Sequence, residues 1–405
     1  MSDSLPSDWR TITLREIAQP IKRPISVQDD VQYRTMGVKW WGEGAYERET
    51  KLGREIKSGR LFAVRSGDLV INRIWVRHGS SGIIDETLEG CVVTQDFPTF
   101  QLDLSQVMTA WLRYMFKAAW FWQECDIKSR GTSGRQRINP DEYLDIEIPL
   151  PRLDEQRRIV AKLDALRARV EQALALQAAA IAEAEALIDT SLYSLFCDDA
   201  TADWQATTLE ALAEIRAGVT LGRKLTGATI DVPYLRVANV QDGRLDLAEV
   251  KEVAIRPNEL AKWRLHHGDL VLTEGGDFDK LGRGTIWQNE IVDCIHQNHI
   301  FRVRPNQEMI LPEFLELEIR SPYGKGYFLS RAKKTTNLAS INQTQLRAFP
   351  VRFPSKPRQA AIVAEMSELH RRIEMLIKAQ RESEQELSAM LPAALDRAFH
   401  GKFLS

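Results

Sequence analysis

Cysteine is scarce in this sequence, and long apolar runs are missing. The four cysteines (Cys91, Cys125, Cys197 and Cys294) are far apart and form no CxxC pair, so the pattern supports neither a disulfide framework nor a zinc finger. We expect four buried thiols. The apolar stretches are too short to span a membrane, and the first ten residues lack the apolar run of a secretory signal. These absences favour a folded cytoplasmic protein with no membrane partner.

Motifs for nucleotide binding and catalysis are missing as well. The sequence has no P-loop, no GxGxxG after a predicted strand, no GxSxG and no HExxH. It also lacks the Asn/Asp-Pro-Pro-aromatic segment with which amino-methyltransferases hold a flipped base. "DFDK" at 277–280 is a weak nuclease candidate, and "CIHQNH" at 294–299 is a weak metal candidate. Because alternate residues of a strand face opposite sides, His299 would point away from Cys294 and His296. We predict no metal site and no catalytic residue.

The net charge of −2 is unfavourable for a nucleic-acid-binding protein, but the charge is unevenly distributed. Residues 319–364 contain nine Lys or Arg and no Asp or Glu, and residues 128–137 contain four Lys or Arg and no acid. Basic segments of this kind attract phosphate even in a chain that is nearly neutral overall. DNA or RNA therefore stays a possible partner.

The chain, 405 residues long, exceeds the size of one ordinary core and repeats one pattern twice. "DWRTITLREIA" from Asp8 returns 195 residues later as "DWQATTLEALA". "GDLVIN" from Gly67 returns 201 residues later as "GDLVLT", and the Pro-to-helix junction at Pro151 returns 203 residues later. We predict a domain over 1–150, a long helix over 151–199, a second domain over 200–353 and a second long helix over 354–405.

Each domain combines strand-like and helical patterns. "GDLVINRIWV" and "GDLVLT" are strand-like, whereas "VMTAWLRYMFKAAWFWQEC" and its counterpart "LPEFLELEIRS" are helical. "YLDIEIPLP" predicts a further strand that stops at its prolines. We therefore predict two α/β (α+β) domains of similar fold.

After each junction the apolar residues follow the 4,3 spacing of a coiled coil, strictly in the second copy and with a shift between Val170 and Leu174 in the first. In the second copy these positions are Ile362, Met366, Leu369, Ile373, Leu376, Gln380, Ser383, Leu387, Met390 and Ala394. Roughly 40 residues at 1.5 Å each make a helix about 60 Å long. Such a helix needs a partner for its apolar stripe, and the other copy provides one.

Gln177 and Gln380 are equivalent positions near the middle of these two helices. Equivalent residues of an antiparallel pair meet only at its two-fold axis, so this pair would set the register of the coiled coil. The alternative is that both are merely tolerated polar residues. We predict an antiparallel coiled coil with an internal pseudo-two-fold axis, which would hold the two domains apart in opposite orientations.

Two basic loops occupy equivalent places before a repeated Ile-Asn. They are "SRGTSGRQR" at 129–137 and "SRAKKTTNLAS" at 330–340. Arg and Lys suit phosphates and guanine, Asn suits adenine, and Ser or Thr suit either. One such loop alone would be read as a solvated loop, but two at equivalent places favour DNA reading.

Further candidates flank the "GDLV" strands. "NRIWVRHG" at 72–79 has its counterpart in "TEGGDFDKLGRG", and "VKWWGEG" has its counterpart in "LRVANVQDG". For Trp40 and Trp41, packing within the fold is the simpler interpretation. The candidate DNA-binding residues are Arg73, Arg77, Arg130, Thr132, Ser133, Arg135, Arg137, Arg236, Asn239, Lys280, Arg283, Arg331, Lys333, Lys334, Thr335, Thr336 and Asn337.

The whole chain resembles the specificity subunit of a type I restriction-modification system. The resemblance rests on the repeated order of domain and helix, on the junction "IPLPRLDEQRRIVAKLD", on "GDLV" in each domain and on the ending "LPAALDRAFHGKF". It implies a non-catalytic DNA reader whose two target recognition domains each bind one half of a bipartite, asymmetric site. The second junction, "FPSKPRQAAIV", departs from the pattern because it lacks the acidic "DEQ" of the first.

The same resemblance implies partners and cofactors. Two modification subunits that carry S-adenosylmethionine and methylate adenine would bind this chain, and ATP- and Mg-dependent restriction subunits would cut unmodified DNA in defence against phage. No cofactor would bind this chain itself. Two rival functions remain open: a single-chain DNA methyltransferase or nuclease with duplicated recognition domains, and a coiled-coil scaffold that binds proteins.

Overall fold

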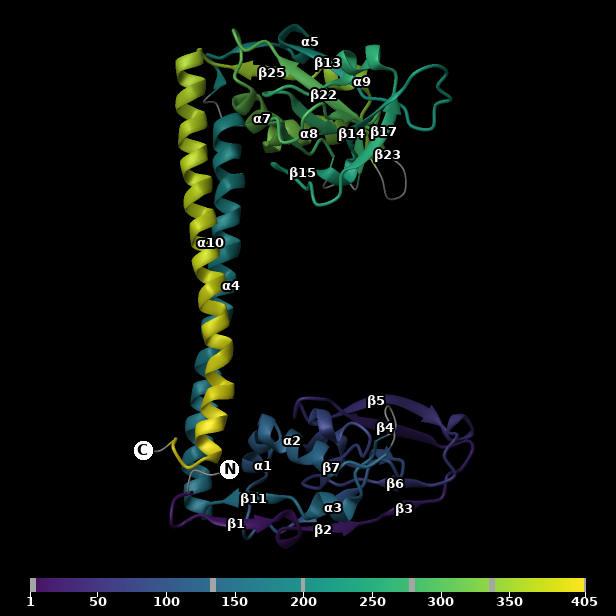
Figure 1. The fold of residues 1–405 in the computed structure, drawn as a ribbon. Coiled ribbons are helices and arrows are strands. Elements are labelled where there is room, and N and C mark those ends of the chain that lie inside the picture. The colour runs from purple at the N-terminus through teal and green to yellow at the C-terminus, as the bar shows by residue number, and fades with distance from the viewer. Residues whose placement is uncertain (1–4, 132–135, 198–200, 277–280, 335–338, 404–405) are drawn as a thin grey trace. The chain divides into compact units, whose positions relative to one another are not determined.

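The structure, a computed structural model (Figure 1), describes residues 5–131, 136–197, 201–276, 281–334 and 339–403. The chain divides into two compact units, one formed by residues 1–178 with 381–405 and the other by residues 179–380. Two helices of 44 residues, α4 (Leu153–Phe196) and α10 (Lys356–Phe399), each contribute a segment to both units. Both ends of α10 lie 203 positions after the corresponding ends of α4.

The first unit contains three sheets with the strand orders β1-β11, β2-β10-β7-β8 and β3-β6-β9-β4-β5. Short helices lie between β10 and α4 (Figure 1). The strands are β1 (Arg10–Thr13), β2 (Ala18–Ile21), β3 (Pro24–Ile25), β4 (Gln32–Val38), β5 (Ala45–Leu52), β6 (Leu61–Ala63), β7 (Leu69–Ile71), β8 (Ser81–Ile83), β9 (Val92–Val93), β10 (Thr99–Leu102) and β11 (Glu147–Leu150). The helices before α4 are α1 (Thr109–Met115), α2 (Ala119–Ile127) and α3 (Pro140–Leu144).

The second unit repeats this plan with the sheets β12-β25 and β13-β22-β18-β20, and its sheet β17-β14-β21 matches the part β5-β4-β9 of the first unit's largest sheet. It also contains the smaller sheets β15-β16 and β19-β24-β23. Its strands are β12 (Gln205–Thr208), β13 (Ala213–Ala217), β14 (Ile230–Leu235), β15 (Val240–Gln241), β16 (Arg244–Leu245), β17 (Lys251–Ile255), β18 (Leu270–Thr273), β19 (Gly275–Gly276), β20 (Gly284–Ile286), β21 (Ile295–His296), β22 (Ile300–Pro305), β23 (Lys333–Lys334), β24 (Ala339–Ser340) and β25 (Pro350–Phe353). Its helices are α5 (Leu209–Leu212), α6 (Leu260–Trp263), α7 (Pro312–Arg320), α8 (Pro322–Arg331) and α9 (Gln343–Arg347).

The core of each unit includes opposite ends of the two long helices. In the first unit, Ile159 and Leu163 from the start of α4 belong to the same core as Phe399 from the end of α10. In the second unit, Phe196 from the end of α4 shares its core with Ile362 from the start of α10. The two helices are therefore antiparallel, and the predicted architecture of two mixed α/β domains with an antiparallel helix pair is confirmed.

One glutamine at each Pro-to-helix junction explains why the junction occurs twice. In the first unit, the backbone N–H of Met108, the N-cap residue of α1, donates to Gln156 Oε1 at 2.8 Å. Gln156 Nε2 donates to the carbonyls of Gln106 at 2.9 Å and Pro151 at 2.8 Å. The fully buried amide thus ties the start of the long helix to the start of the domain helix.

The second unit makes the same three bonds. Gln359 Oε1 accepts from the N–H of Leu311 at 2.9 Å, and its Nε2 donates to the carbonyls of Met309 at 3.2 Å and Pro354 at 2.9 Å. A buried amide needs hydrogen-bond partners, so each glutamine is held to the groups it contacts. Because the contacts are the same in both units, each domain is joined to its long helix in the same way. We call these two networks the glutamine clamps.

Several element predictions were wrong in detail. The strand predicted for "GDLVINRIWV" ends at Ile71, because Asn72 Oδ1 accepts from the N–H of Ile74 and turns the chain. "YLDIEIPLP" begins within helix α3, whose N-cap Asn139 accepts from the N–H of Asp141. The single helix predicted over 107–125 is two helices, and Trp122 Nε1 donates to the carbonyl of Phe116 at the break between them.

The predicted coiled-coil seam is only partly buried. In the second unit, Ile362 and Ile373 are buried, whereas Leu376 is 40% exposed. In the first unit, Ala394 is buried, whereas Met390 is 45% exposed. The strict 4,3 pattern therefore does not predict which residues are buried in the middle of α10. No helix among the described residues is long and apolar enough to cross a membrane.

Candidate nucleic-acid interface

The two basic loops identified in the sequence are closed by equivalent backbone pairs. Arg130 and Arg137 form an antiparallel bridge, with N–H to carbonyl distances of 3.1 and 2.9 Å. In the second unit, Lys333 pairs with Ser340 across β23 and β24. Both residues of this second pair lie 203 positions after those of the first. The residues that close the two loops are therefore equivalent in structure as well as in sequence.

Each loop is anchored to the segment that follows the "GDLV" strand. The N–H of Ile138 donates to the carbonyl of Arg73 at 3.0 Å, and the N–H of Ile341 donates to the carbonyl of Glu274 at 2.9 Å. Arg73 also donates from Nε to the carbonyl of Ile138 at 3.0 Å. In the second unit its counterpart Glu274 carries the opposite charge and lies 2.6 Å from His299 Nδ1. The same backbone frame therefore presents different side chains in the two units.

An arginine held by a glutamine side chain occurs in both units. Arg77 Nη1 donates to Gln136 Oε1 at 2.5 Å in the first unit. In the second unit, Arg283 Nη1 donates to Gln241 Oε1 at 3.2 Å, and its Nη2 donates to the carbonyl of Val237 at 3.3 Å. Both guanidinium groups are half-buried. These contacts hold each planar donor group in place before any ligand arrives, which favours bidentate recognition.

Arg236 and Asn239 stabilise a turn. Asn239 is 2% exposed, and its Nδ2 donates to the carbonyls of Asp246 at 2.8 Å and Glu249 at 2.9 Å. Its Oδ1 accepts from the N–H of Arg236, whose Nη2 donates to the carbonyl of Glu249 at 3.0 Å. The amide of Asn239 therefore forms its hydrogen bonds within the turn, and Asn239 is not part of the proposed interface.

Other predicted residues lie on the surface. Arg130 Nε lies 4.0 Å from Glu142, and Arg137 Nη1 lies 3.6 Å from Asp96. Such exposed ion pairs are weak and are easily exchanged for phosphate contacts. Arg331 and Lys333 are exposed, with the Arg331 guanidinium 5.7 Å from the Tyr327 ring centroid, and Lys334 lies in β23. Thr132, Ser133, Arg135, Lys280, Thr335, Thr336 and Asn337 lie outside the described residues.

The sequence interpretation of Trp40 and Trp41 as packed side chains holds only in part, because both rings pack against aromatic neighbours but remain exposed. Trp40 is 44% exposed and Trp41 is 51% exposed, and both contact the turn that carries Trp75 and His78. Alternation and composition gave no sign of this exposure, because a Trp-Trp pair in a loop is equally compatible with packing. The signal that was available is the neighbouring pair of arginines, Arg73 and Arg77.

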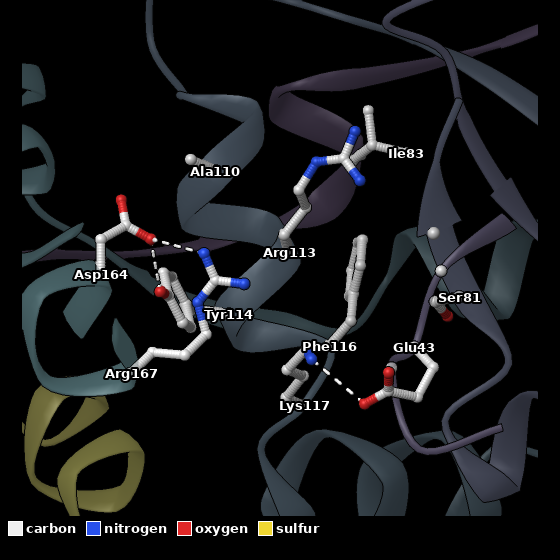
Figure 2. Close-up of a pocket in the computed structure, with 13 residues that line it drawn as sticks. Glu43, Ser81, Ile83, Ala110, Arg113, Tyr114, Phe116, Lys117, Asp164 and Arg167 are labelled. Atoms are coloured by element: carbon white, nitrogen blue, oxygen red, sulfur yellow. Dashed lines mark hydrogen bonds and ion pairs between the residues drawn. The ribbon is translucent and has the colours of Figure 1, made fainter. Parts of the chain in front are cut away.

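Each unit also has a pocket beside its long helix. The first is a cavity of about 310 Å³ between α1 and α4 (Figure 2), where Tyr114 Oη donates to Asp164 Oδ1 at 2.6 Å. Burial, followed by this bond, raises the pKa of Tyr114 above its ordinary value. At the edge, Lys117 Nζ lies 3.1 Å from Glu43. Arg113 and Arg167 also line the cavity, which makes it basic.

The pocket of the second unit occupies the equivalent place and has about 290 Å³. Its ion pair of Arg320 with Asp242, at 2.9 Å, corresponds to that of Lys117 with Glu43. Where the first pocket has Arg113, however, the second has Glu316, a half-buried carboxyl whose pKa is raised by burial. The two pockets therefore share a position but differ in charge.

The structure leaves the register prediction untested. Gln177 is 8% exposed and Gln380 is half-buried.

Among the described residues no group of three His, Cys, Asp or Glu side chains could hold a metal. His296 is buried with Nδ1 2.9 Å from the carbonyl of Ile300, and burial lowers its pKa to about 4.

Comparison with known families gives the decisive match. The model of the type I restriction modification DNA specificity domain matches residues 6–178 and again residues 201–384. The chain belongs to this family. Each match covers one mixed α/β domain together with much of the helix that follows it, so the chain contains two specificity domains.

Relatives and solved structures agree with this assignment. The chain is 28% identical over 188 residues to a putative type I restriction enzyme specificity subunit (MjaX) of Methanocaldococcus jannaschii, covering 44% of each chain. It is 24% identical over 278 residues to the EcoKI specificity subunit of Escherichia coli, covering 65% of this chain and 59% of the relative. The matched parts thus span about half the length of these relatives. The crystal structure of the HsdS subunit from Thermoanaerobacter tengcongensis shares the fold, with a TM-score of 0.68, 21% identity and 98% of both chains covered.

Proposed function

We propose that this chain is the DNA-reading subunit of a type I restriction-modification complex. It recognises a bipartite, asymmetric sequence in double-stranded DNA, with one half-site for each specificity domain. The observation that carries this proposal is the pair of equivalent basic loops, which share their backbone pairing and their anchor but differ in side chains. A shared frame with exchanged side chains is what two related readers of different sequences require.

Each domain offers both kinds of contact that DNA recognition needs. Arg77 and Arg283 are held by glutamines, a geometry that suits the O6 and N7 acceptors of guanine in the major groove. Exposed Arg130 and Lys333, at equivalent loop positions, suit phosphates. Because Arg73 of the first unit corresponds to Glu274 of the second, we expect the two half-sites to differ.

The long helices set the distance between the half-sites. Each helix has 44 residues and is about 66 Å long at 1.5 Å per residue. Half-sites read from one face of DNA are separated by multiples of about 34 Å. The unread spacer of the DNA site would follow from the length of the helix pair.

The chemistry belongs to partner subunits in this proposal. Two modification subunits carry S-adenosylmethionine and methylate adenine, and ATP- and Mg-dependent restriction subunits cut unmodified DNA. Two features support protein partners: the equivalent pockets beside the long helices, and apolar side chains exposed on those helices, such as Leu176, Leu187 and Met375. The scaffold alternative explains the helices but not the duplicated basic loops.

DNase footprinting of the chain, with and without a co-expressed methyltransferase subunit, tests the proposal. We expect two protected patches on a selected duplex when the partner is present. Methylation or cleavage by the chain alone would support a single-chain enzyme, and absence of protection in every combination would support a scaffold.

Matched substitutions connect the footprint to individual residues. Arg77→Ala should weaken protection of one half-site and Arg283→Ala that of the other, each with a loss of affinity of about tenfold or more. Arg60→Ala, at an exposed arginine of the first unit, is the control. Equal effects of both substitutions on both patches would contradict the assignment of one half-site to each domain.

A further inference from the structure

The exposed tryptophans of the chain are gathered in one place. Of ten tryptophans, only Trp40, Trp41 and Trp75 are exposed, at 44%, 51% and 37%, and all three lie in the first unit. Large apolar side chains that are exposed together mark binding surfaces, because water contact with them is unfavourable. We call Trp40, Trp41, Trp75 and His78 the aromatic platform.

Three rings of the platform, those of Trp40, Trp75 and His78, contact one another and are similarly tilted, whereas Trp41 lies edge-on to Trp40 and His78. The centroids of Trp40 and Trp75 are 5.0 Å apart with an interplanar angle of 39°. The His78 ring lies 5.3 Å from Trp40 at 31° and 5.8 Å from Trp75 at 36°. Three neighbouring rings thus form a continuous apolar surface.

Backbone contacts hold the platform before any ligand binds. The N–H of Trp41 donates to the carbonyl of His78 at 2.7 Å, and the N–H of Gly42 donates to that of Gly79 at 2.9 Å. Trp41 has a φ of +58°, which is unfavourable for a bulky residue and is retained here by these bonds. A preformed surface loses little conformational entropy on binding.

The surroundings of the platform favour DNA as its ligand. The two segments that form it, 39–42 and 72–79, contain Lys39, Arg73 and Arg77 and no Asp or Glu. Arg77 lies between Trp75 and His78 in the chain and is bound to Gln136, which belongs to the basic loop 129–137. The platform is therefore continuous with the proposed DNA-reading residues of the first unit.

Duplex DNA presents one apolar group in its major groove, the 5-methyl group of thymine. We propose that Trp40, Trp75 and His78 contact a thymine methyl in the half-site read by the first unit. This inference rests on the proposed function and adds a specific base to it. Polar groups at the edges of the other bases would lose water against these rings without gaining hydrogen bonds.

The second unit lacks the platform among its described residues. The positions equivalent to Trp40 and Trp41 are Asn239 and Val240, both buried, and the position equivalent to Trp75 is Gly276. Thymine reading by exposed indoles is therefore assigned to the first half-site alone.

Replacing thymine by uracil, which removes only the methyl group, tests the inference. The probe is the duplex selected from a random pool by the full chain with its methyltransferase partner, with each thymine of the first half-site replaced in turn. At one position we expect the affinity of the wild-type chain to fall about fourfold, the effect of one methyl group. In the variant Trp40→Ala/Trp75→Ala, the affinity should fall about tenfold on the thymine probe and should no longer respond to uracil.

Two controls separate this effect from misfolding. Leu104→Ala, at a 60% exposed leucine of the first unit, should leave the response to uracil intact. Thymine replacement in the second half-site should affect wild type and double variant equally.

Several results would overturn the inference. These are a selected first half-site without thymine, no effect of uracil at any position, and an unchanged uracil effect in the double variant. Loss of partner binding by that variant, with its uracil response unchanged, would identify the platform as a protein interface instead. Failure of the wild-type chain to select any duplex would instead overturn the proposed function, and this inference with it.

Discussion

Gln156 and Gln359 show how much one side chain can fix. Each buried amide makes three hydrogen bonds that join a long helix to its domain. Removing the amide leaves a buried N–H and buried carbonyls without partners, which costs more than the bonds themselves are worth. Each amide therefore fixes the domain on its helix together with the buried core contacts of that helix, such as those of Ile159 and Ile362.

Gln156→Ala should destabilise the first unit, and Gln359→Ala the second, by about 2 to 4 kcal/mol each. Urea denaturation monitored by hydrogen exchange, which reports the two units separately, measures this. Gln123→Ala, at an exposed glutamine of the first unit, is the matched control and should change stability little. Equal destabilisation by Gln123→Ala would show that the hydrogen bonds of the glutamine clamps do not cause the loss of stability.

Glu318 gives the second unit a pH dependence. Burial raises the pKa of this carboxyl to about 8, although its Oε1 accepts from the N–H of Arg352 at 2.8 Å. The unfolded carboxyl ionises near pH 4.5, so the folded state binds the proton more tightly. The stabilisation is therefore complete below pH 4.5 and is lost as the pH rises through 8.

We expect the urea midpoint of the second unit to fall between pH 5 and 8. Glu318→Gln, which stays neutral, should flatten this dependence, whereas Glu308→Gln, at an exposed site, should not. His296, with its pKa of about 4, acts at lower pH, since its contribution is present above pH 6.5 and is lost as the pH falls through 4. A midpoint that is independent of pH from 5 to 8 in the wild-type chain would contradict the Glu318 assignment.

Among the elements, the long helices were the easiest to predict, and the ends of short strands and the exposure of loop residues were the hardest. Each long helix has a sustained apolar period after a proline, which one sequence can reveal. Short strands such as β7 could not be bounded, because the side chain of Asn72 ends the strand by a local hydrogen bond. Exposure of Trp40 depends on tertiary contacts with a turn more than thirty residues away, so no local pattern could show it.

For the same reason, the sequence could predict some features of the candidate site and not others. The sequence located the two basic loops because they repeat at a fixed separation of 203 residues. It did not show that the amide of Asn239 is buried in its own turn, since an Asn that reads DNA and an Asn that caps a turn have the same composition signal. Nor could it reveal the pockets, which form where α1 meets α4 in the first unit and where α7 meets α10 in the second.

The last turns of α4 and α10 complete the cores of different units. The ring centroids of Phe399 and Trp111 are 4.6 Å apart in the first unit. Those of the equivalent Phe196 and Phe314 are 5.6 Å apart in the second. Both phenylalanines are buried. Phe399→Ala should destabilise the first unit, and Phe196→Ala the second, by about 3 to 5 kcal/mol.

Hydrogen exchange of the two units distinguishes these variants, and each serves as the control for the other. A Phe399→Ala variant that loosens the second unit, while the first keeps its protection, would contradict the assignment of the core.

For the whole molecule, the proposed function makes the length of the helix pair the quantity that sets the spacer of the DNA site. Inserting seven residues into α4 after Gln177 and seven into α10 before Gln380 adds about 10 Å to each helix. We expect the unread spacer of the selected site to grow by about one to three base pairs, while both half-sites stay the same. Selection from random duplexes, followed by sequencing, gives both results. Altered half-site bases with an unchanged spacer would contradict the model.

The division of the chain into units also fixes an order in time. The second unit is formed from one continuous segment, residues 179–380, whereas the first needs residues 381–405. During synthesis the N-terminal residues leave the ribosome first, yet Phe399 can reach their core only after the whole of α10 has been made. The domain that is made first therefore completes its core only after the whole second unit has been made, and until then Trp111 lacks its contact with Phe399.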